Sequence, residues 1–327
     1  MTKTTALAEE ERVDTAGTDA WTDLLARISR LSVTRHFDAY ADIDWDSPEF
    51  ELDPTDRRWE LPGDDPLGST HWYRALPPPT RARLGVEFTA SAMKTGLQFE
   101  SVLKQGLLQF AATLPNGSPE FRYAYHEIIE EAQHSLMFQE FINRTGFDVA
   151  GMGRFNRMVT RFVVRLGRRF PPLFFIFVLG GEDPIDYFQR QELRSGRDLH
   201  PLIERIMRIH VTEEARHLSF ARHYLKREVP TLGPTRRTVL AVGAPLILAG
   251  MAQEMLMPSR QIIRRYQIPN GVLAEAYKDN PAATAQLHAS LRKVRQLCEE
   301  LGLLSRGYRR LWSALGLWDS ASPTGVG

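Results

Sequence analysis

The sequence predicts an all-α protein that folds as a helical bundle. Beyond Thr80, most of the chain consists of long windows in which apolar residues recur with helical periodicity. Alternating runs of Val, Ile and Thr, which would indicate strands, are almost absent. With 43% hydrophobic residues, the chain of 327 residues can bury a sizeable core, arranged as one domain or two.

The N-terminal part differs from the rest of the chain. Residues 1–20 are small, polar and acidic, and we expect them to form a disordered tail. Residues 42–79 contain repeated prolines and turn pairs such as Ser47-Pro48 and Asp53-Pro54, which favour irregular structure. We therefore expect residues 21–79 to form an irregular, proline-rich segment that wraps around a helical core.

The remaining windows predict one helical domain over residues 80–318, with additional C-terminal helices, followed by a short tail over residues 319–327. The long windows cover residues 80–113, 118–145, 154–195 with interruptions, and 199–227, and the later ones cover 235–266, 281–304 and 308–317.

Composition and charge exclude several classes of protein. The 41 basic and 40 acidic residues nearly cancel, so no overall charge indicates nucleic-acid binding. The single cysteine, Cys298, cannot form an internal disulfide, a Cys-based zinc site or an iron–sulfur cluster. We find no pattern of a signal peptide, and the longest apolar stretch, residues 239–251, is too short to span a bilayer. We expect a cytoplasmic protein without a transmembrane segment.

Two short motifs indicate a metal site. Glu131 precedes His134 by three residues, and Glu214 precedes His217 by the same spacing. On a helix this spacing places both side chains on one face, where they can bind the same metal. His210 lies four residues before Glu214 and extends the second motif to HxxxExxH. Three such residues on one face are costly to bury without a metal, although an exposed polar face is an alternative.

A dinuclear site in a bundle needs further carboxylates from two more helices. Glu100 lies on the apolar face of the first long window, where a salt bridge to Lys104 is the alternative interpretation. Glu182 directly follows an apolar run. Because Pro184 must kink this helix or lie in its first turn, Asp183 or Asp186 could take the place of Glu182.

The predicted ligand set therefore combines four carboxylates with three imidazoles and no thiolate, which suits iron or manganese better than structural zinc. Its members are Glu100, Glu131, His134, Glu182, His210, Glu214 and His217.

The order of these residues resembles the AurF-like non-haem diiron N-oxygenase family, of the p-aminobenzoate N-oxygenase type. The pattern of that family is a lone Glu, an ExxH motif, a second lone Glu and then HxxxExxH, and this chain contains every element in order. The resemblance implies a ferritin-like helical core, a homodimer, and two iron ions bridged by Glu131 and Glu214. It also implies that dioxygen is activated to oxidise an amine nitrogen, and that His210 makes one iron richer in nitrogen ligands.

Residues one turn from these ligands predict a dry pocket that favours an aromatic or aliphatic substrate. They are Met93, Leu97, Leu103, Met137, Phe138, Val178, Leu179, Met207 and Phe220. No arginine lies on the inner face of the first helix near Glu100, so the sequence indicates no clamp for a benzoate carboxylate.

Glu130 and Glu213 each precede a predicted ligand. They can accept the second N–H of a ligand histidine, or they can be solvated or paired with Arg216.

We interpret the chain as a diiron monooxygenase that converts a primary, for example aromatic, amine to its hydroxylamine, nitroso or nitro product. The alternatives are a diiron desaturase or hydroxylase acting on a fatty or carrier-bound chain, and a ferritin-like metal-binding protein without an organic substrate. An oxygenase of this kind needs dioxygen and electrons from a ferredoxin or reductase, and some take their substrate from an acidic carrier protein.

A stripe of arginines is a separate feature. Such a stripe is a solvated face, a docking surface for an acidic protein or a membrane contact. Its members are Arg154, Arg157, Arg161, Arg165 and Arg168.

Overall fold

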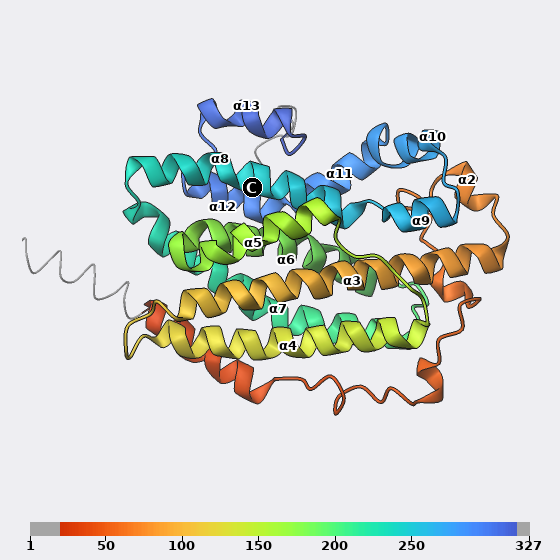
Figure 1. Ribbon diagram of the computed structural model, residues 1–327, viewed down its shortest axis with the longest axis horizontal. Coiled ribbons are helices and arrows are strands. Elements are labelled where there is room, and N and C mark those ends of the chain that lie inside the picture. Colours follow the sequence, from red (N-terminus) through yellow and green to blue (C-terminus); the bar gives the residue numbers. More distant parts are fainter. Residues whose placement is uncertain (1–19, 319–327) are drawn as a thin grey trace, which may run out of the picture.

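The computed structural model describes residues 20–318 and is built from helices, with no strand in that range (Figure 1). The all-α prediction is confirmed. Tails were predicted at residues 1–20 and 319–327; residues 1–19 and 319–327 lie outside the described residues, and residue 20 is helical. No helix in the described part combines the length and apolar character that a membrane span requires.

Four long helices form the central bundle (Figure 1). Each begins with a proline at its first or second position, where the missing N–H is not needed by the helix and the fixed φ angle suits it. They are α3 (Pro78–Ala111), α4 (Pro119–Thr145), α6 (Pro171–Arg194) and α7 (Pro201–Glu228). Their bounds agree with the predicted windows to within a few residues, except where residues 154–195 divide at Phe170 into two helices.

Helix α6 continues through Pro184. Of the two places predicted for this proline, the first turn of a helix is therefore wrong, and Pro184 lies inside the helix just after the predicted ligand Glu182.

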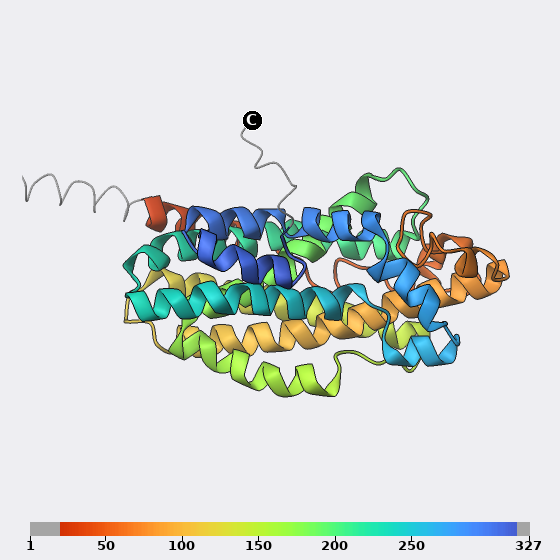
Figure 2. The ribbon, with the colours of Figure 1, turned by 90° about the horizontal axis from the view of Figure 1, so that it is seen from above.

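Further helices surround the bundle. Helix α5 (Arg154–Arg169) forms an outer layer beside α3 (Figures 1 and 2). The window 235–266 divides because Ser259 caps a new helix after Pro258, accepting a hydrogen bond from the amide of Ile262 at 3.3 Å. The C-terminal part consists of α8 (Pro234–Leu256), α9 (Arg260–Arg265), α10 (Asn270–Leu273), α11 (Pro281–Ser290), α12 (Arg292–Glu300) and α13 (Arg306–Ala314).

The prediction of irregular structure over residues 21–79 is wrong at its start, because residues 20–34 are helical. Trp21, Leu24, Leu25 and Ile28 follow helical spacing and are buried in the main core. Trp21 stacks on Phe220 of α7 at 5.7 Å between ring centroids. The apolar residues of this helix are few and lie among polar residues, so the sequence alone did not indicate a helix here.

From residue 35 to residue 77 the chain is largely irregular and lies against the bundle, with the short helices Pro48–Phe50, Arg57–Trp59 and α2 (His71–Arg74). Arg144 of α4 holds this segment through the carbonyl of Trp45, at 2.5 Å, and the carboxylate of Asp46, at 2.9 Å. Trp59 is buried against Phe141 of α4. Residues 35–77 are thus attached to the bundle through side chains of α4.

Gly167 generates a prediction about the attachment of α5. A Cβ atom at Gly167 would lie 2.0 Å from the carbonyl oxygen of Gly106 in α3, so the two helices can approach this closely only through glycine. We expect Gly167→Ala to lower the free energy of unfolding by about 1–3 kcal/mol. Gly250, inside α8, has no atom within 4 Å of such a Cβ, and Gly250→Ala should stabilise by about 0.5–1 kcal/mol. Denaturant titration measures both, and equal effects at the two positions would contradict the close contact.

Candidate metal centre

The seven predicted ligands come together in the middle of the bundle. Helix α3 provides Glu100, α4 provides Glu131 and His134, α6 provides Glu182, and α7 provides the other three. All seven side chains are fully buried. Their ligand atoms form three overlapping groups, each within 4.8 Å, that could hold metal ions: Glu100, His134 and His210; Glu131, Glu214 and His217; and Glu182, His210 and Glu214.

Glu131 and Glu214 lie at the centre of this arrangement. Nδ1 of His217 is 3.0 Å from Oε1 of Glu131 and 3.0 Å from Oε1 of Glu214. Nδ1 of His134 is 3.1 Å from Oε2 of Glu131 and 3.6 Å from Oε1 of Glu214. Each of these two carboxylates therefore faces both ExxH histidines.

His210 lies on the side of Glu100. Its Nε2 is 3.7 Å from Oε1 of Glu100 and 3.8 Å from Oε1 of Glu214, and its ring centroid is 4.6 Å from that of His134. Neither ring nitrogen has a hydrogen-bond partner among the described residues. Because His210, Glu214 and His217 are all buried, the alternative of an exposed polar face is wrong.

The two alternatives to Glu182 are engaged elsewhere. Asp183 is paired with Arg222, and Asp186 is paired with Arg190 at 2.7 Å, whereas Glu182 belongs to one of the groups that could hold a metal. The two side-chain oxygens of Glu182 have no hydrogen-bond partner in the described part of the chain.

Lys104 does not pair with Glu100. Its Nζ donates instead to the carbonyl of Glu131, at 2.9 Å, and to the hydroxyl of Ser135. Oε1 of Glu100 instead lies 3.7 Å from Nε2 of His210.

The concentration of buried carboxylates attracts positive charge. Burial raises the pKa of Glu100 and of Glu182 well above the usual value, and the neighbouring carboxylates raise it further. For His134, burial favours the neutral ring, but hydrogen bonds to Glu131 and Glu213 raise its pKa to about 10. A buried group of four carboxylates is costly unless cations neutralise it.

This donor set fits two divalent metal ions. Four carboxylates carry the charge that two such ions neutralise, and the imidazoles add neutral nitrogen ligands. Carboxyl oxygens of Glu100, Glu182 and Glu214, together with both ring nitrogens of His210, are buried without a hydrogen-bond partner in the protein as described. One Glu from each of two helices and an ExxH motif from each of the other two is the arrangement of dinuclear carboxylate sites in helical bundles.

A second layer of carboxylates orients the histidines, and it does so crosswise. Oε2 of Glu213, on α7, accepts from Nε2 of His134 on α4 at 3.0 Å. Oε2 of Glu130, on α4, accepts from Nε2 of His217 on α7 at 2.7 Å. These contacts keep a proton on Nε2 of each ring, and Nδ1, which faces Glu131 and Glu214, is the atom that would bind a metal after losing its own proton.

Arg216 joins the two outer carboxylates. Its Nη2 lies 2.7 Å from Oε1 of Glu130 and 3.4 Å from Oε1 of Glu213. Although burial favours the neutral acid, the hydrogen bonds from His217 and Arg216 lower the pKa of Glu130 to about 2. The two roles predicted for Glu130 and Glu213, acceptance from histidine and pairing with Arg216, thus occur together.

The wrapping segment contributes to the same network, which the sequence analysis did not foresee. The amide of Phe37 donates to Oε1 of Glu213 at 3.1 Å, and Arg216 lies 3.5 Å from the carbonyl of Arg35. The amide of Ala39 donates to Gln133 of α4 at 2.9 Å. No local pattern marks these backbone groups, because their partners are about 100 or more residues away.

Glu127 is a second residue that the sequence analysis missed. It lies one turn before Glu131, is fully buried, and has neither carboxyl oxygen hydrogen-bonded within the described chain. Burial raises its pKa to about 8. Its spacing of four from Glu131 was the available signal.

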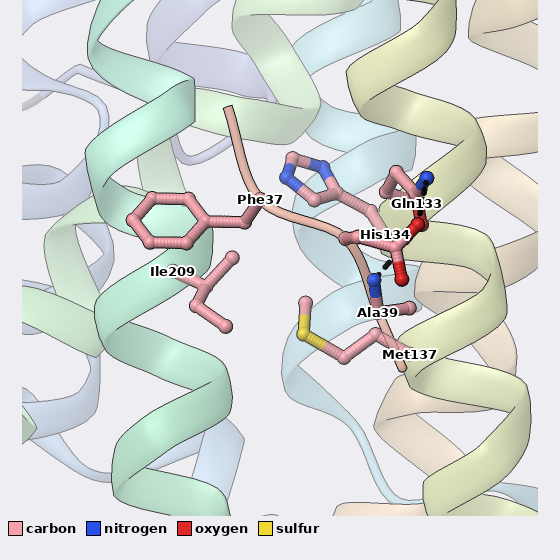
Figure 3. Close-up of a pocket in the computed structure, with 7 residues that line it drawn as sticks. Phe37, Ala39, Gln133, His134, Met137 and Ile209 are labelled. Carbon is pink, nitrogen blue, oxygen red and sulfur yellow. Dashed lines mark hydrogen bonds between the residues drawn. The ribbon is translucent and has the colours of Figure 1, made fainter. Parts of the chain in front are cut away.

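A small hollow lies between the wrapping segment and helices α4 and α7 (Figure 3). It reaches His134, and its other lining residues are Phe37, Asp38, Ala39, Gln133, Met137 and Ile209. Of the nine residues predicted to line a substrate pocket, Met137 borders this hollow.

The other eight predicted lining residues are buried or partly buried in the interior. Phe220 packs between Trp21 and Tyr123 in the core. Met93, Leu97 and Phe138 belong to a core cluster with Met137, and Leu103, Val178 and Leu179 belong to the main cluster.

The family model described as p-aminobenzoate N-oxygenase AurF matches residues 18–302. Uncharacterised proteins of Mycobacterium tuberculosis (strain CDC 1551 / Oshkosh) and Mycobacterium bovis are each 40% identical to the chain over 300 residues, covering 92% of this chain and 88% of theirs. No solved structure matches.

The central position of Glu131 and Glu214 predicts which substitutions reduce the iron content most. Because each carboxylate faces both ExxH histidines, removing it withdraws a donor from both metal positions. We expect Glu131→Ala and Glu214→Ala to retain less iron per chain than Glu182→Ala, measured by metal analysis after reconstitution. Full occupancy in both central variants would refute a bridging role.

The crosswise network predicts a role for Arg216 in metal affinity. In Arg216→Met the carboxylates of Glu130 and Glu213 lose their shared cation, and we expect iron affinity to fall about 10–100-fold. Arg208→Met is the matched control, because Arg208 lies on the same helix, is exposed, and pairs with Glu204. Competition with a chelator measures both variants, and equal affinity in the two would contradict this role.

Proposed function

The chain belongs to the p-aminobenzoate N-oxygenase AurF family, whose fold is the ferritin-like helical diiron fold, and on this premise we propose that it is a diiron oxygenase that oxidises the nitrogen of a primary amine. The observation that carries this proposal is the buried set of four glutamates and three histidines in which HxxxExxH supplies the third histidine.

In this proposal all seven residues are ligands of two iron ions, with Glu131 and Glu214 between them. His210, the additional histidine of HxxxExxH, would give one of the two ions a further nitrogen ligand, as the family resemblance implies. Manganese is the alternative metal for the same donors. When bound, the two ions supply the reduction of dioxygen and the oxidising equivalent that adds oxygen to the amine nitrogen.

The protein residues orient the ligands and exclude water. Glu130 and Glu213 hold the Nε2 protons of His217 and His134, and Arg216 neutralises the pair. The Phe138 ring lies 5.5 Å from the ring of His210 and 6.3 Å from that of His134, and Met137 lines the hollow at His134. A dry site of this kind protects reactive oxygen species from side reactions and favours an aromatic or aliphatic amine over a polar one.

The hollow beside His134 is the proposed approach for the substrate. Asp38 and Gln133 lie in its wall, and no arginine or lysine lines it. An amine is suited to the carboxylate and amide of this wall, whereas the wall offers no arginine to clamp a benzoate carboxylate in a bidentate manner. We therefore propose an amine substrate without a carboxylate, which is oxidised to the hydroxylamine, nitroso or nitro level.

Assembly and location belong to the same proposal. Phe121, Tyr125, Ile129 and Leu136 form an exposed apolar stripe along α4. A stripe of this kind supports a homodimer through this helix. Buried Cys298 suits the reducing cytoplasm.

The proposed reaction is tested with iron-loaded, reduced protein, a panel of arylamines and labelled dioxygen. We expect products heavier by one or two labelled oxygen atoms at nitrogen. A fatty and carrier-bound panel runs in parallel, because oxygen on carbon or loss of two hydrogens would support a hydroxylase or desaturase instead. Oxygen consumption without any organic product would support a metal-binding protein without an organic substrate.

His210 provides the sharpest prediction for this function. Replacing it with Ala removes one neutral nitrogen ligand but none of the carboxylates, so we expect part of the iron to remain while amine oxidation falls by about 100-fold. His223→Ala is the control, because His223 lies on the same helix, is exposed, and bonds to the carbonyl of Ser219 at 2.8 Å. Unchanged oxidation by His210→Ala would remove His210 from the ligand set.

A further inference from the structure

Helix α5 carries positive charge that no ion pair among its described side chains balances. Its 16 residues include six arginines and no lysine, aspartate or glutamate. Arg157, Arg161, Arg165 and Arg168 are exposed, and none of them forms an ion pair among the described residues. The side chain of Arg154, also part of the predicted stripe, lies outside the described part of the chain.

Large apolar side chains are exposed between these arginines. Phe162 is 61% exposed and Met158 is 52% exposed, and the guanidinium of Arg165 lies 5.9 Å from the centre of the Phe162 ring. A solvated face does not need such residues, because their exposure to water is unfavourable.

The inner side of α5 is firmly attached. Val163 and Phe170 are buried in the main core, and Gly167 contacts the backbone of Gly106 in α3. The arginines, with Met158 and Phe162, therefore occupy the outward side of a helix whose orientation is fixed by its inner side.

The composition of this outward side favours a protein partner of opposite charge. Arginine, phenylalanine and methionine are enriched in the cores of protein–protein interfaces, and lysine is depleted there. Unpaired guanidinium groups bind carboxylates in a bidentate manner. A membrane-surface helix presents a broad apolar face to the lipid, whereas here the outward centre is occupied by arginines and much of the apolar face is buried against the bundle.

The position of α5 indicates what this partner does. The helix packs on α3 and α6, the two helices that carry Glu100 and Glu182. Just before it, the amide of Met152 donates to Gln98 of α3 at 2.7 Å, two residues from Glu100. A partner on α5 is thus separated from the candidate metal centre by a single layer of helices, as transfer of electrons over a short distance requires.

We propose that the outward face of α5 is the docking surface for a small acidic one-electron redox protein. This inference rests on the proposed diiron function. Each encounter transfers one electron from the reduced donor, which is oxidised, to the oxidised diiron centre. Two encounters supply the two electrons that reduce both iron(III) ions to iron(II), and no atom is transferred.

The test measures binding rather than turnover, with an acidic [2Fe–2S] ferredoxin as the probe and both metal-free and iron-loaded protein. At about 20 mM salt we expect a complex whose Kd increases at least about tenfold in Arg157→Glu/Arg161→Glu, with the difference shrinking as salt rises. Phe162→Ala should weaken binding by about fivefold or more at all salt concentrations, because its contribution is apolar.

The matched control is Arg260→Glu/Arg264→Glu, which reverses two exposed arginines at the same spacing on α9. This variant should bind the ferredoxin with unchanged Kd. Equal weakening in both double variants, or no weakening in either, overturns the proposal.

Binding to vesicles of phosphatidylserine and phosphatidylcholine tests the alternative that α5 contacts a membrane surface. Binding to vesicles that depends on Arg157 and Arg161, without binding to ferredoxin, would assign α5 to a membrane surface, and binding to neither would leave a solvated face. Both results overturn the proposal. Because binding is measured on metal-free protein as well, a failure here is distinguishable from a failure of amine oxidation.

Discussion

The structure depends on one constraint, the burial of four carboxylates in the interior of an apolar bundle. Glu100, Glu131, Glu182 and Glu214 are fully buried, and their mutual repulsion is tolerable only when cations and hydrogen-bond donors surround them. The three inner histidines supply part of that environment, and two metal ions complete it in the proposed function. The four long helices place these groups together because each contributes its polar residues at a single level of an otherwise apolar face.

The outer network follows from the same constraint. Two carboxylates, Glu130 and Glu213, hold the ExxH histidines crosswise, so the Nε2 side of each ring is held by a carboxylate of the other helix. Arg216 neutralises both carboxylates, and the backbone of the wrapping segment donates to Glu213. Removal of the segment would take away the Phe37 amide that donates to Oε1 of Glu213 and would open this oxygen to water. The wrapping segment is therefore part of the site as well as its cover, although it contributes none of the candidate ligands.

The helices and the ligand candidates were predictable from local spacing alone. ExxH and HxxxExxH place their side chains on one helical face wherever the helix lies, and the structure brings all seven candidates together. The choice between Glu182 and Asp183 was not predictable, because it depends on how α6 continues through Pro184 and on the partner that Arg222 offers to Asp183. The crosswise contacts and the role of Phe37 were equally beyond local patterns, since they join residues far apart in the chain.

The central claim is that these seven residues hold two metal ions between Glu131 and Glu214. Anomalous diffraction at the iron absorption edge, from crystals of the iron-loaded protein, tests it directly. Two bound iron ions would give two anomalous-difference peaks per chain, about 3.5–4 Å apart, on the two sides of Glu131 and Glu214. A single peak, or peaks that lie away from Glu131 and Glu214, would contradict it.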